Sequence, residues 1–200
     1  MDATGQWWDV EDGRPFSTEF AFTRFLTPAL ARRDGILDWV IFVDCDFLLR
    51  ADVAELASEL DASKALMCVK HDFAPVAARK MDGQLQVPYR RKNWSSLMAF
   101  NLRHRANDRL TMECVNTMPG SWLHGMEWLA DDEIGALDPA WNVLVGHGTH
   151  PKPKALHYTD GGPWIDDRPW QDSDAPWINE SHIMQHPSAA TAEKLMQALG

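Results

Sequence analysis

The chain has 200 residues, 45% of them hydrophobic, and this length and composition suit one compact domain with a substantial core. Its formal net charge of −10, from 19 basic and 29 acidic residues, argues against a nucleic-acid-binding protein, because such proteins normally carry a basic face. No run of ~18 apolar residues predicts a transmembrane helix, and the first residues lack the regions of a signal peptide, so we expect a soluble, cytoplasmic protein.

The first part of the chain predicts helices that alternate with short apolar strands. A helix is expected over residues 20–30, where apolar side chains recur at helical spacing and Ser17 is placed to cap the first turn. Residues 39–43 are apolar throughout and predict a central strand that is covered on both faces. A helix over residues 51–60 and a second buried strand over residues 65–69 are expected to follow.

The later part predicts one more strand, further helices and a loop-rich end. In chain order, we expect a loop over residues 71–92, a strand over residues 96–101, a helix over residues 106–118 and a short helix over residues 124–134. An irregular to strand-like segment over residues 137–145 and a terminal amphipathic helix over residues 188–199 are expected to follow. Strands that alternate with helices indicate an α/β domain with a mixed or largely parallel sheet. In such sheets, ligands bind beyond the carboxyl ends of the strands.

Asp44 and Asp46 lie one residue apart at the end of the strand predicted over residues 39–43. Two carboxylates placed there repel each other and lose hydration on burial, and a hard divalent cation resolves both problems. Carboxylate oxygens suit Mg²⁺ or Mn²⁺, which keep open positions for diphosphate oxygens. Alternate side chains of an extended segment share a face, so the pair can converge on one ion while Cys45 points into the core. Without a cation, the same pattern is a solvated turn that uses aspartate as a turn former.

A second segment rich in site-forming residues covers residues 154–164. A short apolar stretch leads to His157, whose neutral imidazole can bind a Mn²⁺-like ion. Gly161 and Gly162 follow, and glycine lets the backbone approach a ligand and present N–H groups to phosphate. Taken alone, one histidine among eight is more often a structural or surface residue, so this assignment depends on the rest of the pattern.

Three segments in this order resemble glycosyltransferases of the GT-A fold, especially the glycogenin and lipopolysaccharide-galactosyltransferase-like group. They are Val-Ile-Phe-Val-Asp-Cys-Asp at residues 40–46, Asn-Trp-Ser-Ser-Leu-Met-Ala-Phe-Asn at residues 93–101, and His-Tyr-Thr-Asp-Gly-Gly-Pro-Trp at residues 157–164. The resemblance implies a GT-A-like, Rossmann-like mixed sheet flanked by helices. It implies one glycosyltransferase-like domain over residues 1–200, with its core over residues 17–170 and a C-terminal tail and helix over residues 171–200.

The resemblance also implies an activity and its cofactor. Asp44, Asp46 and His157 would bind Mn²⁺ or Mg²⁺, which would bind the diphosphate of a nucleotide-sugar donor, with a UDP-sugar expected. The transferred sugar would go to a hydroxyl group of a glycan or another acceptor. Arg24 resembles an arginine, in the helix before the metal-binding strand, that faces the donor sugar or diphosphate, and it is assigned both a catalytic and a donor-binding role.

Further site residues are carried over by motif. Trp94 and Ser95 fall where the family contacts the donor sugar, and the Gly161-Gly162 amides would contact phosphate. Glu127 falls where the family has an Asp-Gln-Asp sequence beside the anomeric carbon, so it is assigned a catalytic role.

The chain departs from the family pattern in two places. The segment before the acidic pair is shorter than usual, and we expect the first βα unit of the fold, which grips the nucleotide base, to be missing. The lysine that precedes the family's Pro-Trp is replaced by Gly162, and its phosphate contact would pass to Lys154, Lys152 or Arg168.

Two other classes of function remain open from the sequence. A metal-dependent phosphohydrolase of the haloacid-dehalogenase type also begins with Asp-x-Asp at a strand end, although the Gly/Thr continuation typical of that class is absent after Asp46. A non-catalytic sugar-binding module derived from a truncated transferase would account for the ten tryptophans, since tryptophan faces stack on sugar rings. Packing in the core or at its rim is, however, the more common role of any single tryptophan.

Overall fold

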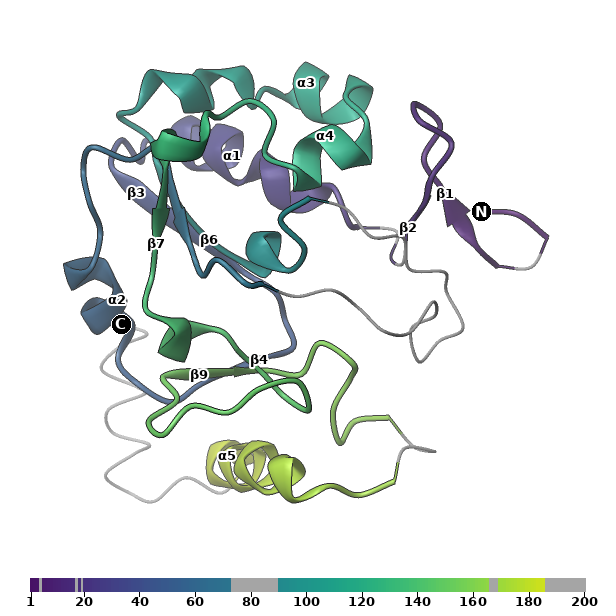
Figure 1. The fold of residues 1–200 in the computed structure, drawn as a ribbon, viewed down its shortest axis with the longest axis vertical. Coiled ribbons are helices and arrows are strands. Elements are labelled where there is room, and N and C mark those ends of the chain that lie inside the picture. The colour runs from purple at the N-terminus through teal and green to yellow at the C-terminus, as the bar shows by residue number, and fades with distance from the viewer. Residues whose placement is uncertain (4, 17, 19, 73–89, 166–168, 186–200) are drawn as a thin grey trace.

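The main sheet of the protein is mixed, as the sequence predicts. The computed structural model describes residues 1–3, 5–16, 18, 20–72, 90–165 and 169–185. The sheet has four strands in the order β3 (Trp39–Val43), β6 (Leu97–Asn101), β5 (Leu66–Cys68) and β7 (Ile134–Ala136). β6 is antiparallel to both β3 and β5, whereas β5 and β7 are parallel (Figure 1). Helices flank this sheet, so the predicted α/β fold is confirmed.

A second sheet joins two segments that are far apart in the chain. It has the order β4 (Phe47–Leu49), β9 (Ala155–His157) and β8 (Val143–Leu144). β4 and β9 are antiparallel and their register pairs Phe47 with His157. Because β4 begins one residue after Asp46, this pairing brings the acidic pair next to the histidine.

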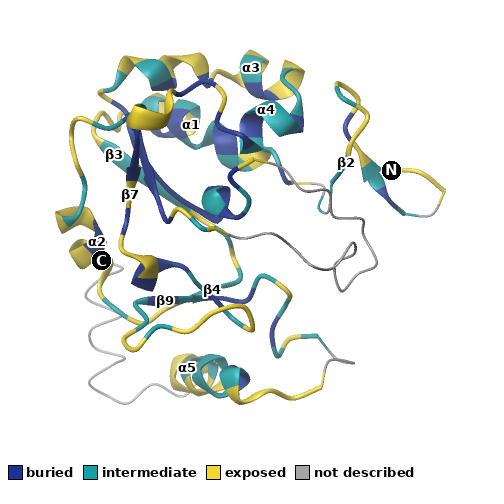
Figure 2. Cartoon of the chain, viewed as in Figure 1, coloured by how far each residue is buried: buried dark blue, intermediate teal, exposed yellow. Residues whose placement is uncertain are grey.

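The strand over residues 39–43 lies at an edge of the described sheet and is not central as predicted, whereas β6 and β5 are internal. All five residues of β6 are buried (Figure 2). Met98 and Phe100 pack in one hydrophobic cluster, and Leu97 and Ala99 in another, as expected from the alternation of side chains along a strand between two covered faces. Among the strands that the structure describes, β3 pairs with β6 alone, and its residues are half-buried or exposed. An apolar run shows that a strand packs against a core, but its place in the sheet depends on which strands pair.

The helices are short and lie mostly above the main sheet in Figure 1. The α-helices are α1 (Thr27–Arg33), α2 (Val53–Ser58), α3 (Met112–Thr117), α4 (Gly120–His124) and α5 (Ala175–Gln185). The 3-10 helices are η1 (Thr23–Leu26), η2 (Trp94–Ser96), η3 (Arg105–Arg109), η4 (Asp131–Glu133), η5 (Pro139–Trp141) and η6 (Asp172–Asp174). A small hairpin of β1 (Trp7–Trp8) and β2 (Pro15–Phe16) lies at the N-terminal end.

Several predicted helices are shorter or divided in the structure. The helix expected over residues 20–30 is η1 followed by α1, and the helix expected over residues 106–118 is η3 followed by α3. Thr111 separates the latter two, because its side chain accepts a hydrogen bond from the Cys114 N–H and caps α3. The short helix expected over residues 124–134 is wrong, since α4 ends at His124 and the chain turns through Met126, whose φ is 52°.

The C-terminal region contains a helix that the sequence pattern did not predict. α5 packs below the β4–β9 sheet (Figure 1), where Trp177 contacts Tyr158 with ring centroids 5.2 Å apart. The helix predicted over residues 188–199 and the proposed cap Ser17 lie outside the described residues. Among the helices that the structure describes, none combines the length and apolar character needed to cross a membrane.

The structure corrects the predicted position of one of the three cysteines. All three are free, and Cys68 is buried in the core, where burial raises the pKa of its thiol to about 12. Cys45, predicted to point into the core, is exposed instead. The alternation of side chains was extended from the strand to this residue, but β3 ends at Val43 and Cys45 lies in the turn before β4.

Candidate metal centre

The acidic pair and the histidine meet at the end of β3. Asp44 follows the last residue of β3, and its N–H donates to the Ser96 carbonyl at 2.9 Å, which extends the pairing with the β6 segment. The N–H of Tyr158 donates to the Asp46 carbonyl at 3.0 Å, and the His157 ring stacks on Phe47 at 4.3 Å. One ligand atom each of Asp44, Asp46 and His157 lies within 4.8 Å of the others. The predicted trio is therefore brought together.

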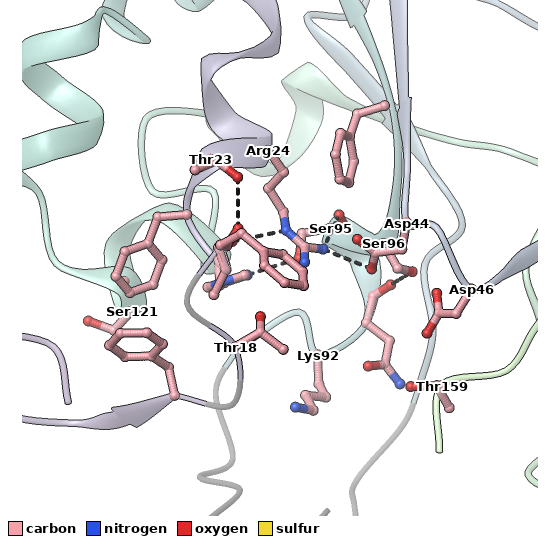
Figure 3. Close-up of a pocket in the computed structure, with 18 of the residues that line it drawn as sticks. Thr18, Thr23, Arg24, Asp44, Asp46, Lys92, Ser95, Ser96, Ser121 and Thr159 are labelled. Carbon is pink, nitrogen blue, oxygen red and sulfur yellow. Dashed lines mark hydrogen bonds and ion pairs between the residues drawn. The ribbon is translucent and has the colours of Figure 1, made fainter. Parts of the chain in front are cut away.

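Arg24 is the nearest cationic partner of this acidic cluster. Its guanidinium donates to Asp44 Oδ2 at 3.0 Å and to the Ser95 carbonyl at 3.0 Å (Figure 3). Burial raises the pKa of Asp44, Arg24 works against that rise, and the neighbouring Asp46 carboxylate adds to it. The pKa of Asp44 stays raised, so one arginine does not compensate for the burial of this carboxylate beside a second one.

The contact between Asp46 and His157 needs a further group. Asp46 Oδ1 is buried and has no hydrogen-bond partner among the described residues, and it lies 3.4 Å from His157 Nε2. The histidine is 3% exposed, and its Nδ1 is 3.0 Å from Asn142 Oδ1. Two carboxylates and one imidazole suit a divalent cation such as Mn²⁺, and an unsatisfied buried carboxylate oxygen fits a metal ligand.

A second histidine lies beside the first. His71 follows β5, and its buried Nε2 has no hydrogen-bond partner in the described part of the chain. Burial lowers the pKa of His71 to about 4, the nearby His157 lowers it as well, and a hydrogen bond with Asn142 raises it only in part. This imidazole is therefore neutral at physiological pH.

Arg24, the two aspartates and His157 lie on the wall of a cavity of about 410 Å³, whereas His71 is not among its lining residues. Its wall comes from the N-terminal hairpin, the segment before α1, the end of β3, the loop before β6, α4 and the segment after β9 (Figure 3). Asn93 lies on this wall with a φ of 64°, and its buried Nδ2 has no hydrogen-bond partner among the described residues. An unsatisfied donor and an unsatisfied acceptor at one cavity indicate a polar ligand.

The predicted site residues divide between the cavity and its surroundings. Those that line it are Arg24, Asp44, Asp46, Ser95 and His157. Those outside its lining are Trp94, Glu127, Lys154, Gly161 and Gly162. Among the described residues that line the cavity, none is a tryptophan.

Other contacts account for several of the outer residues. Glu127 has a side chain that is 41% exposed and forms an ion pair with Arg90 at 3.4 Å. Lys154 donates to Glu59 at 3.0 Å. A Cβ at Gly162 would lie 2.2 Å from the Trp164 ring, so close packing already requires glycine there. Their proposed roles in donor binding or catalysis stay predictions.

Three cavity or site residues were not found from the sequence. His124 lies on the wall, and its Nδ1 is 2.9 Å from Ser95 Oγ. Ser96 also lines the cavity, and Asn142 supports His157 from behind. Ser96 lies within the motif at residues 93–101 and could have been named from it. His124 and Asn142 carry no local signal, because their roles depend on the packing of α4 and η5.

The chain is similar to known proteins in sequence and in fold. No family model matches the chain. Protein CDI of Arabidopsis thaliana is 47% identical over 184 residues, which cover 88% of this chain and 69% of that protein. The bifunctional glycosyltransferase WbbM is similar in structure, with a TM-score of 0.54, 18% identity, and coverage of 83% of this chain and 36% of its own. The glycosyltransferase GlyE of Streptococcus pneumoniae gives a TM-score of 0.53 and 16% identity, covering 81% of this chain and 43% of its own.

The two solved structures establish the fold. The chain spans less than half the length of each of these proteins. At these identities the likeness concerns the fold alone, which is that of GT-A-like glycosyltransferases, as the sequence motifs predict.

Proposed function

The chain belongs to the same family as Protein CDI of Arabidopsis thaliana, and from its fold and its cluster of two aspartates and a histidine we propose that it is a metal-dependent glycosyltransferase. It would move a sugar from a nucleotide-sugar donor to a hydroxyl acceptor. One observation carries the proposal: Asp44, Asp46 and His157 converge at a cavity, in a chain whose fold is that of glycosyltransferases.

The three residues are proposed to hold Mn²⁺ or Mg²⁺. The bound cation would supply Lewis-acid stabilisation of the diphosphate that leaves the sugar. Asp46 Oδ1, which has no hydrogen-bond partner among the described residues, lies 3.4 Å from His157 Nε2, and Asp44 completes the set. A UDP-sugar is the donor that we propose, with a glycan or another hydroxyl compound as acceptor.

The surrounding residues would bind and orient the donor. Arg24 is already held by Asp44 and the Ser95 carbonyl, so its positive charge is fixed beside the acidic cluster. A fixed cation stabilises negative charge without reorganisation during the reaction. Ser95 and the unpartnered Asn93 amide lie on the same wall and would hydrogen-bond the sugar.

The proposal is tested by removing one ligand charge. Asp46→Asn should lower Mn²⁺-dependent hydrolysis or transfer from a UDP-sugar by at least about 100-fold, because the metal contributes several kcal/mol of charge stabilisation. Activity is measured by UDP release across a panel of UDP-sugars, with and without a chelator.

Asp38→Asn is the matched control, since this aspartate lies just before the same strand and its side chain is 64% exposed. It should keep wild-type turnover. UDP release by the Asp46→Asn variant at the wild-type rate, or wild-type turnover that the chelator leaves unchanged, would contradict the metal assignment.

A further inference from the structure

A chain of hydrogen bonds leads from the backbone to the metal-facing histidine. Ser96 Oγ donates to the Asn93 carbonyl at 2.7 Å, and Asn142 Nδ2 donates to Ser96 Oγ at 2.9 Å. Asn142 Oδ1 in turn is 3.0 Å from His157 Nδ1. The three side chains are almost inaccessible, with residue exposures of 3% for Ser96, 1% for Asn142 and 3% for His157. Water does not compete for these contacts.

The direction of each hydrogen bond in this relay is fixed by its first member. A backbone carbonyl can only accept, so the single proton of Ser96 Oγ is committed to Asn93. The hydroxyl oxygen then has only lone pairs left for Asn142, which must turn its NH₂ group toward the serine. The Asn142 carbonyl oxygen consequently faces His157, and an oxygen of this kind can only accept.

The relay therefore determines which ring nitrogen of His157 carries the proton. Nδ1 must be the donor to Asn142 Oδ1. In a neutral imidazole the other nitrogen is then a bare acceptor. That nitrogen, Nε2, is the atom 3.4 Å from the unpartnered Asp46 Oδ1, so two lone pairs meet at the place where a cation would lie.

We infer that Asn142 is a positioning residue that holds His157 in its metal-binding tautomer, and this inference rests on the proposed function. Asn142 is well placed for the task, because it precedes β8, the strand that pairs with β9 and sets Leu144 against His157. A ligand oriented in this way needs no rearrangement when the cation binds.

The inference is tested first in the metal-free wild-type protein. ¹⁵N-edited NMR at about pH 8, where an ordinary imidazole is neutral, distinguishes a protonated from a bare ring nitrogen. The His157 signals are identified by their loss in His157→Gln. We expect Nδ1 to carry the proton. A proton on Nε2 would overturn the inference without the need for any variant.

Variants then test whether Asn142 is responsible. Asn142→Leu keeps the side-chain volume close but removes the acceptor, and it should weaken Mn²⁺ binding by about 10- to 100-fold and shift the proton toward Nε2. Asn142→Asp restores an acceptor for Nδ1 and should keep both the tautomer and the metal affinity. Should Asn142→Leu fail to fold, Ser96→Ala serves in its place, because it frees the amide to reverse and should give a mixture of tautomers.

Asn107→Leu is the control for loss of a buried asparagine. Asn107 is fully buried and donates to the Ala65 and Asn101 carbonyls, away from the cavity. It should lower the melting temperature and leave Mn²⁺ affinity and the His157 tautomer unchanged. Equal losses of Mn²⁺ affinity in Asn107→Leu and Asn142→Leu would overturn the inference, since both would then be effects of stability.

The experiment separates this inference from the proposed function. If His157 carries its proton on Nδ1 but the wild-type protein binds no Mn²⁺, the relay stands and the metal proposal fails. If Mn²⁺ binds and drives sugar transfer while His157 carries its proton on Nε2, the metal proposal stands and the relay fails.

Discussion

At the residue scale, Asp44 carries an energetic cost that a metal would remove. Its pKa is raised, chiefly by burial, so the folded protein disfavours the ionised form relative to the unfolded chain. This cost is fully present above the folded-state pKa and disappears below the ordinary value of 3.8, where both states are protonated. Residues that cluster charge at a binding site commonly lower the stability of the unliganded protein.

Asp44→Asn should therefore stabilise the metal-free protein. The amide keeps an acceptor for Arg24 but removes the charge, so the melting temperature in a chelator should rise at neutral pH and the gain should shrink as the pH falls. Mn²⁺ should raise the melting temperature of the wild type and not that of the variant. Differential scanning fluorimetry measures both, and a lower melting temperature of the metal-free variant at neutral pH would contradict this account.

The residues of the candidate metal centre differ in how well they could be predicted from the sequence. The convergence of Asp44, Asp46 and His157 was predictable, because an acidic pair after an apolar strand and a histidine before a Gly-Gly turn are local patterns with a chemical reason. Asn142 and His124 were not, since a hydrogen-bond partner more than a dozen positions away leaves no local pattern. Glu127 was aligned to a catalytic segment, yet His124 of the same region is the residue that reaches the cavity.

At the element scale, the sequence revealed strands better than their arrangement. The three apolar runs at residues 39–43, 65–69 and 96–101 contain β3, β5 and β6. The β4–β9 pairing went unpredicted, because each partner has only three residues and the two lie more than 100 positions apart. This pairing is nevertheless the contact that brings His157 to the acidic pair, and its strength depends on what holds β9 in place.

Glu59 links the end of α2 to η5 and to the residue before β9. At the end of α2, it accepts hydrogen bonds from Trp141 Nε1 at 2.9 Å, the Asp138 N–H at 3.2 Å and Lys154 Nζ at 3.0 Å. Burial works to raise the pKa of Glu59, but these hydrogen bonds outweigh it and the pKa is lowered. A lowered carboxyl pKa contributes stability that is present above the ordinary value of 4.5 and is lost as the pH falls through the folded-state value.

Glu59→Gln should accordingly lower the free energy of unfolding at neutral pH by about 1–2 kcal/mol, the range of hydrogen bonds to a charged group that is partly exposed. The difference should disappear at a pH below the folded-state pKa. Urea unfolding at several pH values measures it. Glu55→Gln is the control, because Glu55 reaches the same lysine at 3.5 Å with a side chain that is 54% exposed, and its effect should stay below about 0.5 kcal/mol. A pH-independent loss in Glu59→Gln would contradict the charge argument.

At the scale of the whole molecule, the cavity is assembled from segments that span most of the chain. Its lining extends from Asp9 in the N-terminal hairpin to Thr159 beyond β9. The hairpin is tied to α4 by two contacts: the Gly120 N–H donates to Asp9 at 2.6 Å, and Ser121 Oγ donates to Asp12 at 2.6 Å. The two sides of the cavity therefore depend on contacts between residues that lie more than 100 positions apart.

Asp9→Ala should loosen the hairpin wall while leaving the sheet intact. The carboxylate accepts a buried hydrogen bond from Gly120, and the loss of about 1.5–3 kcal/mol should speed amide hydrogen exchange in residues 7–16 by roughly 10- to 100-fold. Exchange in β6, which lies in the core, should not change. Because the hairpin lines the cavity, binding of a UDP-sugar with Mn²⁺ should also weaken, as measured by calorimetry.

Glu11→Ala is the matched control, since Glu11 is an exposed acid two residues further along the same hairpin. Unchanged exchange in the hairpin of Asp9→Ala would show that this wall is held by the aromatic packing of Phe16 on Phe22, whose rings are 4.9 Å apart, and not by the contact with α4.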